Sequence, residues 1–213
     1  MKWTYAGAVV LALSVAAGAA SCSNAESTTS PTPSSGSGGG GGGNLGLGTL
    51  QVLMKDSPFS DAEAVLVTFN EVSVHHTGAA WLRLPFAEAA EARTCDLKRL
   101  EEVTDLLGVG QLEAGHYTQL RLEVSRTRIY WDNKSTGAAC APSIIAPLGT
   151  FSEATVPSGT IHLNRQFTID PGATTTITLD FDGDKSIKQT GNGKYMMQPV
   201  IAIMSVTGGS GGQ

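Results

Sequence analysis

The stretch AGHYTQLRLEVS, residues 114–125, decides the fold class because its apolar and polar side chains alternate. Positions 120, 122 and 124 hold Leu, Leu and Val, whereas positions 121, 123 and 125 hold Arg, Glu and Ser. A period of two places one face of a β-strand against a core and the other face in water. We therefore expect a half-buried strand, launched by a turn at residues 113–116 and continuing to residue 131.

Segments of the same kind lie on both sides of this stretch, separated by turns. In one of them the apolar positions change parity after residue 69, which predicts a β-bulge at residues 70–71. The further strands are expected at residues 50–54, 65–74, 81–84, 144–156, 161–163, 167–169, 174–182 and 196–206. Many short, mostly alternating strands predict a mainly β protein, an antiparallel β-sandwich with one short helix.

The helix is expected over residues 96–108. Asp96 is a suitable N-cap, positions 100, 103 and 107 form one apolar stripe, and Gly108 supplies a stop. Residues 86–93 are rich in Ala and Glu, and we expect them to add a helical turn.

Residues 1–21 have the three parts of a secretory signal peptide. Lys2 provides the positive charge, residues 6–20 form an uncharged apolar run, and small residues then lead into Cys22. The run of about 15 residues is shorter than the ~20 that a helix needs to cross a bilayer. We therefore interpret the segment as a signal peptide rather than as a membrane span.

The residues before Cys22, Gly-Ala-Ala-Ser at positions 18–21, resemble the bacterial lipoprotein box, although Ala19 stands where that pattern usually has Leu. The resemblance implies that Cys22 receives diacylglycerol and becomes the first residue of a membrane-anchored chain. Ser23 follows in place of an Asp retention signal, which implies an outer-membrane lipoprotein that faces the periplasm or the cell surface. The alternative is an ordinary signal peptide cut after residue 20, with Cys22 a spare thiol.

The remainder divides into three parts by composition. Residues 22–47 are rich in Ser, Pro and Gly and are expected to form a disordered tether. A coil of roughly 26 such residues has an r.m.s. span of about 25–30 Å, enough to hold a domain clear of lipid headgroups. Residues 48–207 are expected to form the sandwich, and residues 208–213 a second Gly/Ser tail.

The charge of the chain limits the kinds of partner that it can bind, and its cysteines indicate the compartment in which it works. The chain has 14 Lys and Arg against 19 Asp and Glu, without a basic stripe, so we expect no nucleic-acid partner. Cys95 and Cys140 remain once Cys22 is assigned to lipid, and two thiols of an exported protein are expected to pair in a disulfide. The alternative is two separate buried thiols.

Two groups of side chains deserve comparison with metal sites. Asp180, Asp182 and Asp184 alternate like ligands of a calcium loop, but the Gly is at the fourth loop position rather than the sixth and no Glu stands at the twelfth. A solvated strand end is the preferred interpretation. His75 and His76 are adjacent and would point to opposite faces of a strand, so we predict no metal site and no cofactor.

No catalytic residue is predicted, because no Gly-x-Ser-x-Gly or comparable motif is present. Tyr130 and Trp131 lie beside a polar turn at residues 132–135 and are candidates for stacking against a glycan or a protein partner. Aromatic residues on strands are more often part of the core, and this alternative stays open here.

Several blocks in order resemble a family of bacterial and archaeal surface lipoprotein domains, catalogued as a domain of unknown function (family 4382). The matching blocks are residues 48–50, 71–75, 114–122, 179–187 and 190–201. The resemblance covers about residues 47–206, implies a β-sandwich of the transthyretin-like or prealbumin-like type, and carries over no catalytic residue. His116 stands where the family more often has Thr, and the Cys95/Cys140 pair looks like a local addition.

The sequence thus favours a non-enzymatic, lipid-anchored surface domain that binds a ligand or supports an envelope assembly. A carbohydrate-binding or adhesion module is the alternative, and a hydrolytic enzyme comes third. An exposed aromatic strip would favour sugar binding, and a closed pocket with perturbed acids would favour catalysis.

Overall fold

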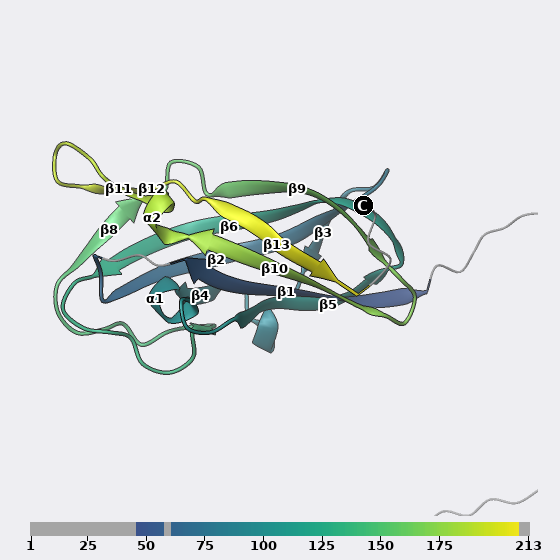
Figure 1. Cartoon of the computed structure of the whole chain (residues 1–213), viewed down its shortest axis with the longest axis horizontal. Coiled ribbons are helices and arrows are strands. Elements are labelled where there is room, and N and C mark those ends of the chain that lie inside the picture. The colour runs from purple at the N-terminus through teal and green to yellow at the C-terminus, as the bar shows by residue number, and fades with distance from the viewer. Residues whose placement is uncertain (1–45, 58–60, 209–213) are drawn as a thin grey trace, which may run out of the picture. The chain divides into compact units, whose positions relative to one another are not determined.

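Two β-sheets packed face to face form the domain seen in a computed structural model of the chain, which describes residues 46–57 and 61–208 (Figure 1). The mainly β fold predicted from the alternating sequence is confirmed. The predicted signal peptide, Cys22 and nearly all of the predicted tether lie outside the described residues. Within the described residues, no helix is long and apolar enough to cross a bilayer.

The smaller sheet has the strand order β13-β10-β1-β5. Its strands are β1 (Leu47–Ser57), β5 (Asp105–Glu113), β10 (Thr174–Asp182) and β13 (Ile201–Thr207). β1 and β10 are parallel, whereas the other two pairs are antiparallel. The sandwich is therefore mixed rather than purely antiparallel, because alternation within a strand does not reveal the direction of its neighbour.

The larger sheet has the order β11-β12-β8-β6-β2-β4-β7, with β3 on β2 and β9 on β6. The long strand β6 (Gly115–Tyr130) contains the alternating stretch and lies at the centre of the sheet, paired with β2, β8 and β9. The other strands are β2 (Ala64–His76), β3 (Trp81–Leu84), β4 (Arg93–Asp96), β7 (Cys140–Ala141), β8 (Phe151–Thr155), β9 (Thr160–Ile169), β11 (Ile187–Gln189) and β12 (Tyr195–Met197).

The core fills the space between the two sheets. Alternate residues of β1 and β10 point into it, and the inward apolar residues are fully buried. From the larger sheet, Phe69 meets Phe181 of β10 edge to face, with ring centroids 6.5 Å apart. The predicted bulge is confirmed: the register of β2 against β6 shifts between Phe69 and Glu71. The shift lets Val67 and Val72, of opposite parity, both face the core.

The predicted helix is confirmed only at its start. α1 (Leu97–Leu100) is one turn long, and the Asp96 side chain caps it by accepting a hydrogen bond from the Lys98 backbone N–H. Residues 105–108 belong instead to strand β5, which pairs with β1. Val103, expected on the buried stripe, is 50% exposed. Pairing with β1 overrides the helical spacing because it provides a full row of backbone hydrogen bonds.

Other boundaries differ in smaller ways. The single strand expected at residues 196–206 is split at Pro199 into β12 and β13, which belong to different sheets. The two strands expected at residues 161–169 are one, β9. Residues 86–93 contain only a short 3-10 helix, η1 (Ala87–Ala89), and a one-turn helix, α2 (Gly183–Ser186), follows β10.

The predicted disulfide is confirmed. Cys95 on β4 and Cys140 on β7 are cross-strand partners joined by a bond between their sulfurs. The buried Arg93 lies beside the bridge and donates a hydrogen bond of 2.9 Å to the carbonyl of Cys140. The bridge and this bond add to the pairing with β4 in holding the two-residue strand β7 at the edge of the larger sheet.

Candidate functional site

The outer face of the larger sheet gathers aromatic, imidazole and guanidinium groups where β3, β2, β6 and β9 lie side by side. The strand register places Trp81 opposite His75, and Arg121 between Ser73 and His162. The neighbours of these residues along each strand point into the core, so the group itself faces outward. We call Trp81, His75, Arg121 and His162 the Trp81 platform.

The Trp81 ring lies across the sheet and contacts the other three members. Its centroid is 5.3 Å from that of His75 and 5.7 Å from that of His162. The guanidinium carbon of Arg121 lies 4.6 Å from the Trp81 ring, within the range of a cation–π contact. Ser73, which Arg121 contacts, is only 1% exposed although it points away from the core. The ring itself stays partly exposed.

The positive charge of Arg121 on the platform is paired with a neighbouring carboxylate. Arg121 forms an ion pair with Glu71, and its Nε donates a hydrogen bond of 3.0 Å to the Ser73 hydroxyl. The hydrogen bond from Arg121 lowers the pKa of the Glu71 carboxyl below its usual value. His75 Nδ1 is 3.0 Å from the Thr118 hydroxyl. The platform thus offers a partly exposed aromatic ring surrounded by paired polar groups.

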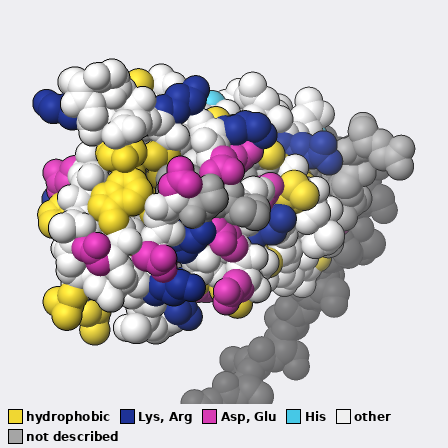
Figure 2. All heavy atoms as spheres, turned by 60° about the vertical axis from the view of Figure 1, so that its left-hand side comes forward, with side chains coloured by type: hydrophobic (Ala, Val, Ile, Leu, Met, Phe, Trp, Pro, Cys, Tyr) yellow, Lys and Arg dark blue, Asp and Glu magenta, His cyan; other side chains and the backbone are white. Residues whose placement is uncertain are grey.

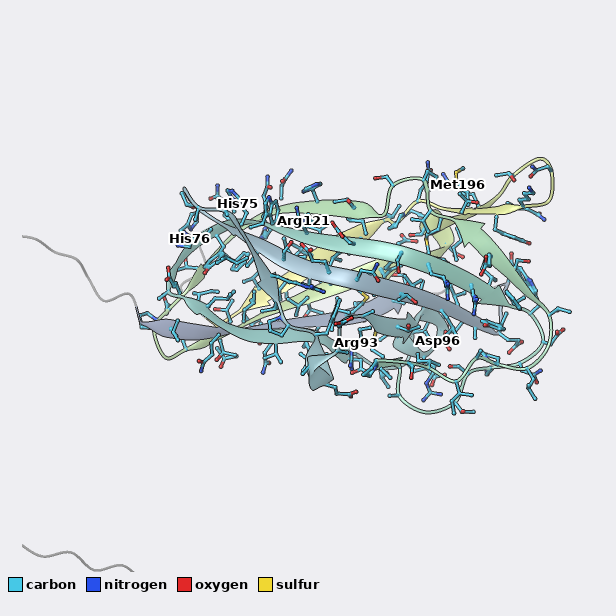
Figure 3. All side chains as sticks on the ribbon, turned by 180° about the vertical axis from the view of Figure 1, so that it is seen from behind. His75, His76, Arg93, Asp96, Arg121 and Met196 are labelled. Carbon is cyan, nitrogen blue, oxygen red and sulfur yellow. A yellow bond between two sulfur atoms is a disulfide. The ribbon has the colours of Figure 1, made fainter. Side chains whose placement is uncertain are left out.

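Sequence reasoning missed this group because its members come from four strands. His75 and His162 are isolated in the sequence, and Trp81 is one of several aromatic residues on strands, which are more often part of the core. One signal in the sequence could have found part of the group. After the bulge, His75 occupies a polar position of the alternating pattern, which places its side chain on the outer face. Figure 3 shows His75 and Arg121 on the same part of the sheet, with Asp96 well apart from them.

The two aromatic residues singled out in the sequence do not share a surface. Tyr130 is 2% exposed and packs against Phe151, with ring centroids 5.5 Å apart. Trp131 is half-buried, with its ring 5.2 Å from that of Tyr195 and its Nε1 donating a hydrogen bond to Ser152. Because they are neighbours at the end of one strand, their side chains lie against different clusters of the core.

Of the alternating acids, Asp180 and Asp182 are held by neighbours of opposite charge or by hydroxyls, and Asp184 is exposed. Asp180 accepts a hydrogen bond of 3.0 Å from Ser57. Asp182 accepts bonds from the backbone N–H and the ammonium of Lys185 and so caps α2. Among residues 46–57 and 61–208, no three His, Cys, Asp or Glu side chains lie close enough together to hold a metal ion.

Two buried acids lie at the end of the sandwich that carries α1. Asp96 accepts hydrogen bonds from the backbone N–H groups of Val65 and Lys98, yet its burial raises the pKa of the carboxyl. Asp56 is 4% exposed; its Oδ1 accepts from the Gly183 N–H, but its Oδ2 has no partner. Burial raises the pKa of Asp56 to about 8.

These acids are remote from the Trp81 platform. Val65, which binds Asp96, precedes Ser73 by eight residues on the same strand, about 26 Å at 3.3 Å per residue. On the face drawn in Figure 2, Lys and Arg side chains are interspersed with Asp and Glu, so this face has no patch of a single sign.

We expect Asp56→Asn to stabilise the protein by about 2 kcal/mol at pH 8 and by less at pH 5. Between the unfolded pKa of 3.8 and the folded value of about 8, the unfolded state is ionised while the folded state holds a proton. Wild-type stability therefore falls as the pH rises through this window, whereas the amide does not titrate. Urea unfolding at both pH values measures the difference.

The matched control for Asp56 is Asp184→Asn, which changes an exposed acid near the same end. It should leave the urea midpoint unchanged at both pH values. A pH-independent effect of Asp56→Asn would contradict the assignment of a protonated carboxyl to the folded state.

Comparison with known proteins gives one match. Residues 47–199 match the model of a family described as Domain of unknown function (DUF4382), which spans most of the sandwich. No curated protein and no solved structure matched the chain.

Proposed function

The chain belongs to the DUF4382 family of domains of unknown function, and from this premise we propose that it is a lipid-anchored protein of the cell envelope. Its sandwich is the head of the molecule and acts as a non-enzymatic binding domain. Lipid at Cys22 fixes it to a membrane, and the Trp81 platform is the surface that meets the ligand.

The residues at positions 18–22 support the anchor, because small side chains before a Cys fit the site of lipid attachment. The Ser, Pro and Gly residues that follow have little apolar surface to bury. A tether of this composition and roughly 26 residues spans about 25–30 Å, so the head can reach a ligand beyond the lipid headgroups. Two or three acyl chains anchor a protein stably where one would not.

The observation that carries the binding role is the outward position of the Trp81 platform. Aromatic rings with a polar edge are enriched in binding surfaces because one side chain offers both apolar area and hydrogen bonds. Trp81 is partly exposed, and its indole donates no hydrogen bond within the described part of the chain. Arg121 lies over one side of the ring, and the remaining exposed surface of Trp81 and its N–H are available to a ligand.

A non-enzymatic role is supported by the position of the perturbed acids. Catalytic sites bring titratable groups with shifted pKa values together in one cleft. Here Asp96 lies toward the other end of β2, since its partner Val65 is about 26 Å along the strand from Ser73, and it serves to hold α1, β2 and Ser135 together. On the platform itself, Arg121 and Glu71 bind each other.

Replacing the lipidated residue tests the anchor. In cells expressing the full chain, the wild-type protein is expected in the detergent phase after phase partition, and Cys22→Ala in the aqueous phase. Mass spectrometry of the N-terminal peptide should show acyl chains on residue 22 of the wild type. An unmodified N-terminus and recovery of the wild type in the aqueous phase would overturn the proposal of an anchor.

The same Cys22→Ala chain tests the binding role without the contribution of lipid. Added to envelopes prepared from cells that lack the protein, it should sediment with them saturably. If it stays in the supernatant at every concentration, the head has no envelope ligand and the binding role is wrong.

A further inference from the structure

Resting on the binding role proposed above, we propose that the ligand of the Trp81 platform is an uncharged oligosaccharide. One sugar ring stacks on Trp81, and the chain continues past His162 into a cleft at the start of β9. The inference follows from three features of this surface: the open ring, the internal pairing of its charges, and the row of polar groups that leads from the ring to the cleft.

The open ring supplies the stacking surface. Trp81 is held in place by His75, His162 and Arg121, all within 6 Å of its centroid. A ring fixed in this way loses little side-chain entropy when a ligand packs on it. The apolar C–H face of a sugar fits an aromatic face, whereas its hydroxyls need hydrogen-bonding groups beside the ring.

The arginines on and beside the platform are already bound within the protein, which favours an uncharged ligand. Arg121 is bound to Glu71 and Ser73. The neighbouring Arg83 donates hydrogen bonds of 2.8 Å and 3.2 Å to the backbone carbonyls of Asn70 and Glu91. Both guanidinium groups are thus engaged within the protein, so an acidic saccharide would find no cation ready to pair with it.

Polar groups continue from the ring along β9. Thr160, His162 and Asn164 are exposed on its outer side, while Leu163 between them is buried. The register places them beside Glu123, Arg121 and Gln119 of β6. Hydroxyl, imidazole and amide groups therefore follow one another at the two-residue repeat of a strand, about 6.6 Å.

A cleft of about 300 Å³ opens at the end of this row. Its walls are Pro157, Ser158, Thr160, Ile161, Gln198 and Pro199. Thr160 belongs to both the row and the cleft, so the two meet at this residue. The mixture of proline rings, hydroxyls and an amide in its walls is suited to a sugar, which also alternates apolar and polar faces.

The test is calorimetric titration of the mature Cys22→Ala chain with uncharged hexasaccharides: β-1,4-linked glucose, β-1,4-linked N-acetylglucosamine and α-1,4-linked glucose. Hexagalacturonate is the acidic counterpart. We expect saturable binding of at least one uncharged hexasaccharide and at least about tenfold weaker binding of the acidic one. Trp81→Ala should weaken binding about tenfold or more, as expected for an aromatic residue at the centre of a contact.

His162→Ala is a second variant that leaves the fold intact, because this side chain is exposed. It should weaken binding about threefold or more. Trp131→Ala is the matched control: it removes the same type of side chain from a half-buried position just after β6, where the ring contacts Tyr195. Its affinity should stay within twofold of the wild type, and thermal unfolding of each variant shows that it is folded.

The experiments distinguish a wrong saccharide assignment from a wrong binding role. If none of the uncharged saccharides binds, or if Trp81→Ala and His162→Ala bind as tightly as the wild type, the saccharide assignment is wrong. The binding role nevertheless stands if the Cys22→Ala chain still sediments with envelopes and the hexasaccharides fail to displace it. Displacement by an uncharged hexasaccharide, lost in Trp81→Ala, supports both.

Discussion

Loss of the disulfide, in the double variant Cys95→Ala and Cys140→Ala, is expected to lower the free energy of unfolding by about 4 kcal/mol. The bridge joins residues 45 positions apart, so cutting it restores considerable freedom to the unfolded chain. It also ties down β7, which has only two residues and one neighbouring strand. Without the bridge, the pairing with β4 and the hydrogen bonds of Cys140 to Arg93 and Asp105 remain to hold that strand.

Urea unfolding of the oxidised and reduced proteins measures this contribution. Reduced wild type should unfold at the same urea midpoint as the double variant, and the reductant should leave the double variant unchanged. Both are best made in a Cys22→Ala chain, so that the third thiol takes no part. Equal midpoints of oxidised and reduced protein would contradict a stabilising bridge.

Asp96→Ala is expected to lower the free energy of unfolding by about 3–5 kcal/mol. The carboxylate is completely buried and accepts hydrogen bonds of 3.0 Å from the Val65 N–H and 3.1 Å from the Lys98 N–H. It also accepts one from the Ser135 hydroxyl. Alanine leaves all three donors without an acceptor in a place that water does not reach, and removes the cap of α1.

Asp96→Asn is the control that separates these hydrogen bonds from the charge. Its side-chain oxygen can still accept from the two N–H groups, and the Ser135 hydroxyl can turn to accept from the new amide. The loss should therefore be about 1 kcal/mol. Burial raises the pKa of Asp96, so wild-type stability falls as the pH rises from the unfolded value of 3.8 toward the folded one, and the amide removes that slope.

Urea unfolding of wild type, Asp96→Ala and Asp96→Asn at pH 5 and pH 7 gives the comparison. Alanine should be the least stable at both values. If alanine proves as stable as asparagine, the three donors find other acceptors and the network has no structural role. Asp56 and Asp96 are both buried acids with raised pKa values, yet replacing them should change the stability in opposite directions. The reason is that both carboxyl oxygens of Asp96 accept hydrogen bonds, whereas Asp56 Oδ2 accepts none.

Much of the fold could be predicted because alternation is a local property. The stretch at residues 114–125 predicted a strand with one buried face, and β6 has that pattern. The parity change predicted the bulge after Phe69, and the expectation of export predicted the pairing of Cys95 with Cys140. The helical stripe at residues 96–108 misled because three apolar residues at helical spacing also occur by chance in a turn followed by a strand.

The candidate site could not be predicted in the same way. Trp81, His75, Arg121 and His162 carry no shared motif, and only the register of β3, β2, β6 and β9 brings them together. Tyr130 drew attention because it precedes a polar turn, but its ring is buried in a small separate cluster with Ala64 and Leu66, where it packs against Phe151.

By itself, the sequence determined which side of most strands is apolar and where the chain turns between them, because these depend on neighbours a few residues away. The tertiary structure alone decided that β1 and β10 run parallel across more than a hundred residues, and that four strands assemble a tryptophan platform. Two distant strands can pair in many registers whose local energies are nearly equal. Packing of the whole core determines which register forms, so the register cannot be derived from any single segment.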